Sequence, residues 1–258
     1  MHFDFSRRNW LRFAPLAWPL AKAAAADRGN PAPVTDSFPM QPTAMVREMV
    51  SVSHGNFAKV KELVEEHPSL AKAAWDWGFG DWETALGAAS HTGDYDIAVY
   101  LIAHGARPTL FSATMMGHLD VVKAFLAAQP GAQRIAGPHS ISLLAHAKNG
   151  GARAEPVLRY LESLGDADRA AAVPLADAEM AALAGVYTFG DGPSERIEVT
   201  FNKGMLLFTR EGAVGRPLYH TGEKAFYPAG AEAVRIRFAD STLTVHDPKL
   251  VLTAKRVS

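Results

Sequence analysis

Apolar positions recur at helical spacing through the middle of the chain, and each recurrence follows a polar turn built around glycine. The turns are centred on Gly55, Gly93, Gly117 and Gly150, which are 38, 24 and 33 residues apart. An apolar pair follows each turn: Val60 and Leu63, Ile97 and Leu101, Val121 and Phe125, and Val157 and Leu161. Such spacing gives a helix one apolar stripe. The pattern therefore predicts helix–turn–helix units that stack, because no unit can bury its stripe alone.

The residues at these turns fit the ends of helices. Glycine adopts the left-handed conformation that ends a helix without a clash of Cβ. Asn56, Asp94 and Asp120 stand where a side chain can cap or support the next helix.

From about residue 175 the pattern changes to short stretches in which apolar and polar residues alternate. The stretches are 186–189, 196–201, 205–209, 216–220, 234–238, 242–246 and 250–254. Glycine, proline, aspartate and asparagine, which favour turns, separate them. This alternation predicts an antiparallel β sandwich or a small barrel. Residues 166–173, between the two patterns, are either a linker or a final helix.

Three short motifs in the helical region resemble the ankyrin repeat. The run TALGAA at residues 84–89, with Gly93, is similar to the pattern T-P-L-H-x-A-A-x-x-G. The run GHLDVV at residues 117–122 is similar to its continuation, and HGA at 104–106 to its exit. Ala85 replaces the usual proline, and the spacing is irregular. We therefore expect α and β structure in separate domains: a short ankyrin-type α-helical repeat stack over residues 45–168, then a small antiparallel β sandwich or barrel over residues 175–258.

The start and end of the β region resemble a small accessory domain. The runs LAGVY at residues 183–187 and KRV at 255–257 are similar to the ends of the β domain appended to many bacterial serine hydrolases. G-x-S-x-G does not occur in the chain, so the nucleophile of hydrolases that use this motif does not carry over. The resemblance covers about one third of the chain.

The N-terminus resembles a twin-arginine signal peptide. The run SRRNWLR at residues 6–12 contains Arg7 and Arg8, with Trp10 and Arg12 in place of the usual phenylalanine and lysine. A short apolar stretch and three alanines follow, which predicts a signal peptide over residues 1–26 and a proline-rich linker over 27–44. The motif implies export of the folded protein by the twin-arginine translocase to the periplasm or the exterior. An uncleaved amphipathic N-terminus or a short anchor is the alternative, but the stretch is too short for a stable membrane span.

Composition narrows the function classes. The formal net charge of −1 argues against nucleic-acid binding, which needs a basic surface. The absence of cysteine removes disulfides, thiolate nucleophiles and thiolate metal sites.

An aromatic and acidic loop over residues 75–83 contains three of the five tryptophans. Because tryptophan is enriched in binding hot spots, we predict that this loop binds a protein partner. The predicted partner-binding residues are Trp75, Asp76, Trp77, Phe79, Asp81, Trp82 and Glu83. The alternative is that these aromatic side chains pack against the helices or the β domain.

The ten histidines show no metal-binding spacing such as H-E-x-x-H. His54, His91 and His118 stand in or beside the glycine turns, where the ankyrin resemblance gives them a hydrogen bond that braces the turn. The sequence therefore predicts neither a metal site nor a cofactor.

The favoured hypothesis is an exported, non-catalytic protein that binds an unidentified protein partner. One alternative is an enzyme or small-ligand protein with a pocket in the β domain or the interdomain cleft. Candidate lining residues for a β-domain pocket are Tyr219, His220, Tyr227 and Arg235. The other alternative is a structural scaffold.

Overall fold

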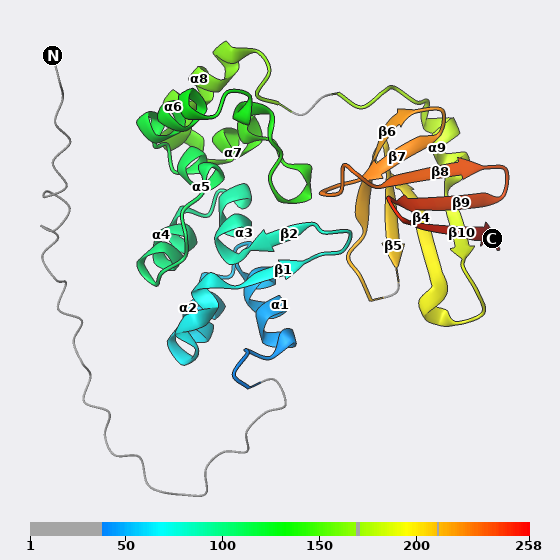
Figure 1. The fold of residues 1–258 in the computed structure, drawn as a ribbon, viewed down its shortest axis with the longest axis horizontal. Coiled ribbons are helices and arrows are strands. Elements are labelled where there is room, and N and C mark those ends of the chain that lie inside the picture. The colour runs from blue at the N-terminus through cyan, green and yellow to red at the C-terminus, as the bar shows by residue number, and fades with distance from the viewer. Residues whose placement is uncertain (1–37, 169–170, 211) are drawn as a thin grey trace, which may run out of the picture. The chain divides into compact units, whose positions relative to one another are not determined.

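The computed structural model describes residues 38–168, 171–210 and 212–258, which form a helical region followed by a β-barrel (Figure 1). The predicted signal peptide, including Arg7 and Arg8, lies outside the described residues, as does most of the predicted linker.

The helical region contains four pairs of antiparallel helices around the predicted glycine turns. Their bounds are α1 Thr43–Val52, α2 Phe57–Glu66, α3 Ala85–Thr92, α4 Tyr95–Ala103, α5 Leu110–Met115, α6 Leu119–Ala128, α7 Leu143–Asn149 and α8 Glu155–Leu164. Asn56 and Asp94 cap α2 and α4 by accepting hydrogen bonds from Lys59 N and Ile97 N. Short 3-10 turns η1 Pro68–Lys72, η2 Ala132–Arg134, η3 Pro138–Ser140 and η4 Gly151–Ala154 join them.

The prediction of an ankyrin-type repeat stack is wrong, because the connections between the helix pairs all differ. A β-hairpin of β1 Ala74–Asp76 and β2 Trp82–Thr84 joins the first pair to the second. A short irregular segment joins the second pair to the third, and a longer one with two 3-10 turns joins the third to the fourth. Glycine turns and apolar spacing specify a helix pair locally, but a regular stack also needs equal connections. The unequal glycine spacing of this chain does not supply them.

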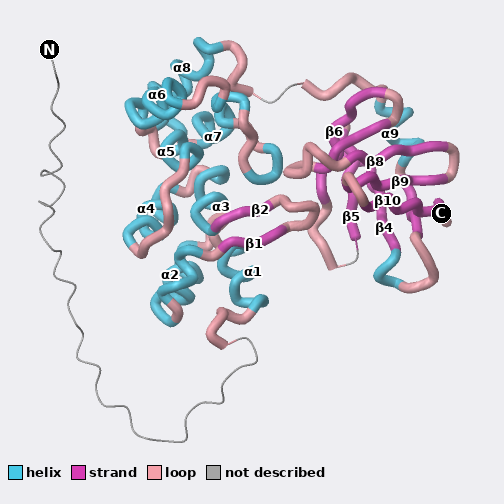
Figure 2. The backbone as a smooth tube through the Cα atoms, viewed as in Figure 1, coloured by secondary structure: helices cyan, strands magenta, loops and turns pink. Residues whose placement is uncertain are grey.

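The C-terminal region forms a closed antiparallel barrel of eight strands, preceded by α9 Asp177–Leu183. The strands are β3 Gly185–Thr188, β4 Arg196–Asn202, β5 Met205–Arg210, β6 Arg216–Gly222, β7 Ala225–Pro228, β8 Arg235–Ala239, β9 Thr242–Asp247 and β10 Leu250–Arg256, with a 3-10 turn η5 Pro193–Glu195 after β3. Each strand pairs with its neighbour in sequence, and β10 closes the barrel against β3. Figure 2 shows the strands of this region in magenta. Of the two predicted β architectures, the barrel is therefore the one that forms.

Alternation along the strands builds the barrel core. In β4, Ile197 and Val199 are buried while Arg196 and Glu198 are exposed. The sequence pattern missed β7, because AFYP buries three of its four residues and shows no alternation.

Two apolar cores lie in the helical region, one among α1–α4 and one among α5–α8. None of the helices in the described ranges combines the length and apolar character that a membrane crossing requires.

Candidate metal centre

The β1–β2 hairpin carries a fully buried carboxylate. The side chain of Glu83 has no exposed surface, whereas its neighbours on β2, Trp82 and Thr84, face outward. Alternation along the short strand thus turns the Glu83 side chain inward. A buried carboxylate needs positive or hydrogen-bonding partners, because the loss of hydration is costly.

Three histidines from separate elements converge on Glu83. His54 comes from the turn after α1, His91 from the last turn of α3, and His139 from η3. Oε1 of Glu83 lies 2.8 Å from Nε2 of His91, and Oε2 lies 3.4 Å from Nε2 of both His54 and His139. The Nε2 atoms of His54 and His91 are 3.1 Å apart.

These distances fit the first coordination shell of a metal ion. One donor atom from each of the four residues lies within 4.8 Å of all the others. In a tetrahedral zinc site, bonds of about 2.0–2.2 Å place neighbouring ligand atoms about 3.4 Å apart. The four side chains can therefore all reach one ion with little movement.

Outer hydrogen bonds set the tautomers that metal binding requires. Nδ1 of His54 lies 3.1 Å and 3.0 Å from the carbonyl oxygens of Val50 and Ser51, which only accept hydrogen bonds. Nδ1 of His139 lies 2.8 Å from the carboxylate of Asp81. Both Nδ1 atoms therefore carry a hydrogen, and the lone pair of each neutral ring is on Nε2, facing the centre.

The two oxygens of Glu83 have different surroundings among the described residues. Oε2 accepts a hydrogen bond of 2.8 Å from Nε1 of Trp77. Oε1 is buried and lies 2.8 Å from Nε2 of His91, its nearest polar neighbour in the cluster. A buried oxygen with an unused lone pair, facing a histidine nitrogen, has the arrangement expected when both atoms bind the same cation.

The electrostatics of the cluster favour a positive charge at its centre. Burial acts to raise the pKa of Glu83, but the polar contacts with His139 and His91 and the charges of His139 and His54 outweigh it and lower the pKa to about 2. Burial acts to lower the pKa of His139, but Asp81 and Glu83 outweigh it and raise the pKa to about 9. Without a metal, a protonated His139 therefore supplies the positive charge at neutral pH.

The loop that carries His139 has a backbone conformation that needs external support. His139 and Ser140 have φ values of 58° and 57°, which are unfavourable for residues with a Cβ. Asp81 supports the loop, because Oδ1 accepts a hydrogen bond of 2.9 Å from the backbone N–H of His139. The hydroxyl of Ser140 adds a second tie by accepting a 2.7 Å hydrogen bond from the backbone of Gly230.

The barrel completes this support through Arg216 on β6. Its guanidinium group donates to Asp81 Oδ2 at 3.3 Å and to the carbonyl oxygens of Ala229 and Trp77 at 2.7 Å and 2.6 Å. The Asp81 carboxylate also packs so closely on Gly230 that a Cβ there would overlap it. The hairpin tip adds an apolar contact, since the rings of Phe79 and Phe208 are 6.1 Å apart.

A cavity of about 710 Å³ lies beside the cluster, and His54 and His139 form part of its wall. Both side chains are about 30% exposed, whereas Glu83 is inaccessible. Other lining residues include Arg47, Ser51, Trp75, Trp77, Arg216 and Tyr219. A small molecule in this cavity can therefore approach the centre from the side of these two histidines.

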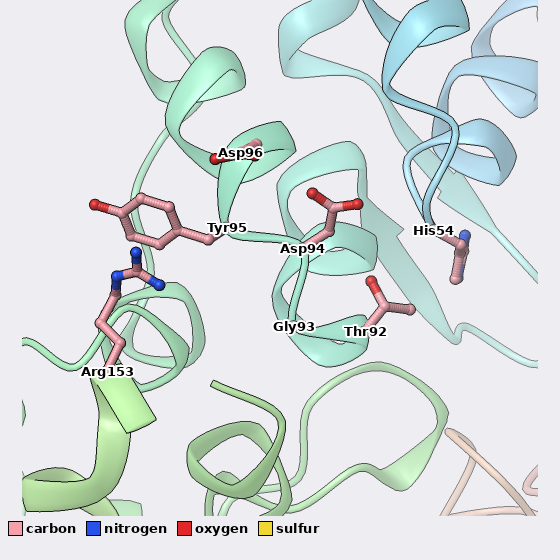
Figure 3. A pocket seen from close by; sticks show the side chains of 7 residues that line it. All are labelled: His54, Thr92, Gly93, Asp94, Tyr95, Asp96 and Arg153. Carbon is pink, nitrogen blue, oxygen red and sulfur yellow. The ribbon is translucent and has the colours of Figure 1, made fainter. Parts of the chain in front are cut away.

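A second, more polar cavity of about 460 Å³ also touches His54 (Figure 3). Two of its polar side chains have structural roles. Asp94 caps α4, and the guanidinium carbon of Arg153 lies 3.7 Å from the centre of the Tyr95 ring. We therefore assign the first cavity, and not this one, to the candidate site.

The structure divides the residues predicted to bind a partner. Trp77, Asp81 and Glu83 belong to the histidine cluster and its supports. Trp75 packs against the helical core, and Asp76 accepts a hydrogen bond from Gly78 N. Phe79 packs against the barrel, while Trp82 is 64% exposed. The partner-binding role itself stays a prediction.

The candidate ligands escaped the sequence pattern because they are far apart in the chain. His54 and His91 are separated by 37 residues, and Asp81 and His139 by 58. His54 makes the predicted turn-bracing contact through Nδ1, which leaves Nε2 for the cluster. His118 lies outside the cluster and is exposed. The sequence signal that pointed toward the cluster was that His54 and His91 stand in or beside two of the glycine turns.

Comparison with known proteins gives no relative for this chain. No family model, no curated protein and no solved structure matches it. The functional assignment therefore depends on the geometry of the cluster and its cavity.

The metal-free protein is expected to gain most stability from Glu83 between about pH 4.5 and 6.5. The Glu83 contribution is present above its ordinary pKa of 4.5 and is lost as pH falls toward 2. The His139 contribution is present below its ordinary pKa of 6.5 and is lost as pH rises toward 9. We expect the difference in Tm between the wild type and Glu83→Gln, both treated with chelator, to be largest in that window. A pH-independent difference would contradict this assignment of charges.

Proposed function

We propose that the protein binds one divalent transition-metal ion through His54, Glu83, His91 and His139 and presents it to a small molecule in the adjoining cavity. The observation that carries the proposal is the convergence of the four donor atoms, including the buried Oε1 of Glu83, which lies 2.8 Å from Nε2 of His91.

The donor set favours zinc or a similar first-row metal. Imidazole suits zinc, copper, iron and nickel, whereas calcium and magnesium prefer sites made of oxygen ligands. Three imidazole nitrogens and one carboxylate oxygen match known types of zinc ligand. We therefore choose zinc as the metal for the tests.

The protein residues around the centre have distinct roles in this proposal. Trp77 orients Glu83, and Asp81 holds His139 in the tautomer that leaves Nε2 free. The half-buried rings of His54 and His139 leave the cavity side accessible. A bound zinc ion would supply a Lewis acid that polarises an oxygen atom of a ligand.

This proposal favours the alternative of a small-ligand protein over that of a protein-binding module. Its site is the cluster of three histidines and Glu83, with the cavity beside it. Binding of a small molecule beside the ion is the function that such an arrangement supports best, and direct contact with the ion would need a fifth coordination position, since the four side chains fill a tetrahedral site. Export by the twin-arginine route remains a separate proposal, which rests on the motif at residues 6–12.

The decisive experiment is a zinc titration of chelator-treated protein in competition with a chromophoric chelator. We expect one zinc ion per chain and a rise in Tm, since a ligand at a hundred times its Kd stabilises a protein by about 2.7 kcal/mol. His118→Ala is the matched control, because His118 is an exposed histidine outside the cluster. Absence of stoichiometric binding, or a loss of binding in His118→Ala, would refute the proposal.

Cobalt(II) provides a spectroscopic check of the same site. Its visible absorption reports the coordination geometry, and it should be displaced by one equivalent of zinc.

A further inference from the structure

The cavity beside the candidate metal centre has features that select a class of ligand. The ligand class rests on the proposed metal function, because the metal supplies one of the contacts. The cavity volume of about 710 Å³ is within the range of sites that bind small organic molecules.

Aromatic side chains from both regions line the cavity. Trp75 and Trp77, from the hairpin, are half-buried and pack against the helical core. Tyr219, from β6, lies with its ring centre 5.2 Å from that of Tyr227. Because these rings are held by their neighbours, they offer a planar ligand preformed apolar surfaces.

The free positive charge of the cavity comes from Arg47. Among the described residues, Arg47 makes no ion pair or hydrogen bond, and its side chain is exposed at the cavity. Arg216 also lines the cavity, but its guanidinium group is already bound to Asp81 and to two carbonyl oxygens. An unpaired arginine is well suited to a carboxylate, which its planar group binds through two parallel hydrogen bonds.

Arg47 and the candidate metal ligand His54 lie on the same side of α1 and the turn that follows it. Arg47, Ser51 and His54 follow at spacings of four and three residues along α1 and the turn after it, and all three line the cavity. At about 1.5 Å per residue, Arg47 and His54 are about 10 Å apart along the helix. A ligand with an aromatic ring and a negative group at one end can lie along that distance.

The negative charges nearby do not cancel this preference. Asp76 lines the cavity, but its carboxylate accepts a hydrogen bond from Gly78 N. Its negative charge also acts to raise the pKa of Arg216, so the two charges interact. Glu83 balances only half of the charge of a divalent ion. With a metal bound, the cavity therefore has a net positive character.

We infer that the cavity binds a small aromatic carboxylate, with its ring among Trp75, Trp77 and Tyr219 and its negative group toward Arg47. The neutral end of such a ligand would face the metal between His54 and His139.

The test uses zinc-loaded full-length protein and four probes: benzoate, benzamide, benzylamine and acetate. Binding is measured by calorimetry and by the fluorescence of the tryptophans that line the cavity. We expect benzoate to bind at least about tenfold more tightly than each of the other probes. Arg47→Gln should remove the preference for benzoate over benzamide, whereas the matched control Arg107→Gln, an exposed arginine outside the cavity, should keep it.

The outcomes separate this inference from the metal proposal. Equal binding of benzoate and benzamide, or a benzoate affinity that Arg47→Gln leaves unchanged, would overturn the ligand class while the measured zinc binding stands. Failure of the earlier zinc titration would overturn both.

Discussion

Replacing Glu83 with glutamine is expected to lower zinc affinity by at least about a hundredfold, beyond the 10–100-fold typical of residues outside the first coordination shell. Glutamine keeps the size of the side chain and can still accept the hydrogen bond from Trp77 Nε1. It removes the negative charge and the second carboxylate oxygen, and Oε1 is the atom that lies 2.8 Å from His91. The measurement is zinc competition against a chelator of known affinity.

Two further variants make this result specific to the centre. His91→Ala should show a similar loss, because His91 is the most buried of the three histidines. Glu62→Gln is the matched control, since Glu62 is an exposed carboxylate that pairs with Lys59 on α2. Circular dichroism must show that each variant is folded. A folded Glu83→Gln protein with wild-type zinc affinity would rule out Glu83 as a ligand.

Asp81→Asn is expected to lower zinc affinity by about 10–100-fold, although Asp81 does not contact the metal in our proposal. The asparagine oxygen can still accept from the backbone N–H of His139, but the amide nitrogen cannot accept from Nδ1. The imidazole would then favour a hydrogen on Nε2, which blocks that atom as a ligand. The tautomer can be read from the nitrogen chemical shifts of His139.

A purely structural role for Asp81 would give a different result. We also expect the pKa of His139 in the metal-free protein to fall from about 9 toward 6.5 in Asp81→Asn, because Asp81 is one of the two carboxylates that raise it. Asp166→Asn is the control, since Asp166 forms an exposed ion pair with Arg134 and is not part of the histidine cluster. If Asp81→Asn weakens zinc binding while the pKa and tautomer of His139 stay unchanged, the positioning role is wrong.

The coupling of the barrel to this site gives a reason for the two regions to act together. Arg216 of β6 holds Asp81, and Asp81 holds His139. A change in the barrel near Gly230 or Arg216 can therefore alter the geometry of a histidine in the helical region. This connection could not be anticipated, because 135 residues separate Arg216 from Asp81.

The sequence alone determined the local structure. Glycine turns, capping residues and apolar spacing specified the helix pairs, because these signals act within a few residues. Alternation specified most strands of the barrel for the same reason. The short connections between those strands also favoured pairing of neighbours, although sequence could not choose between a sandwich and a barrel.

Tertiary structure decided the arrangement of the helices and the identity of the site. The ankyrin prediction failed because it extended a local pattern to a global one, while the unequal connections control how the pairs pack. The metal-site residues come from a turn, a hairpin, a helix end and a 3-10 turn, and no sequence spacing links them. Only folding brings Glu83 inward and places His54, His91 and His139 around it, because convergence of donor atoms is a property of three-dimensional packing and not of order along the chain.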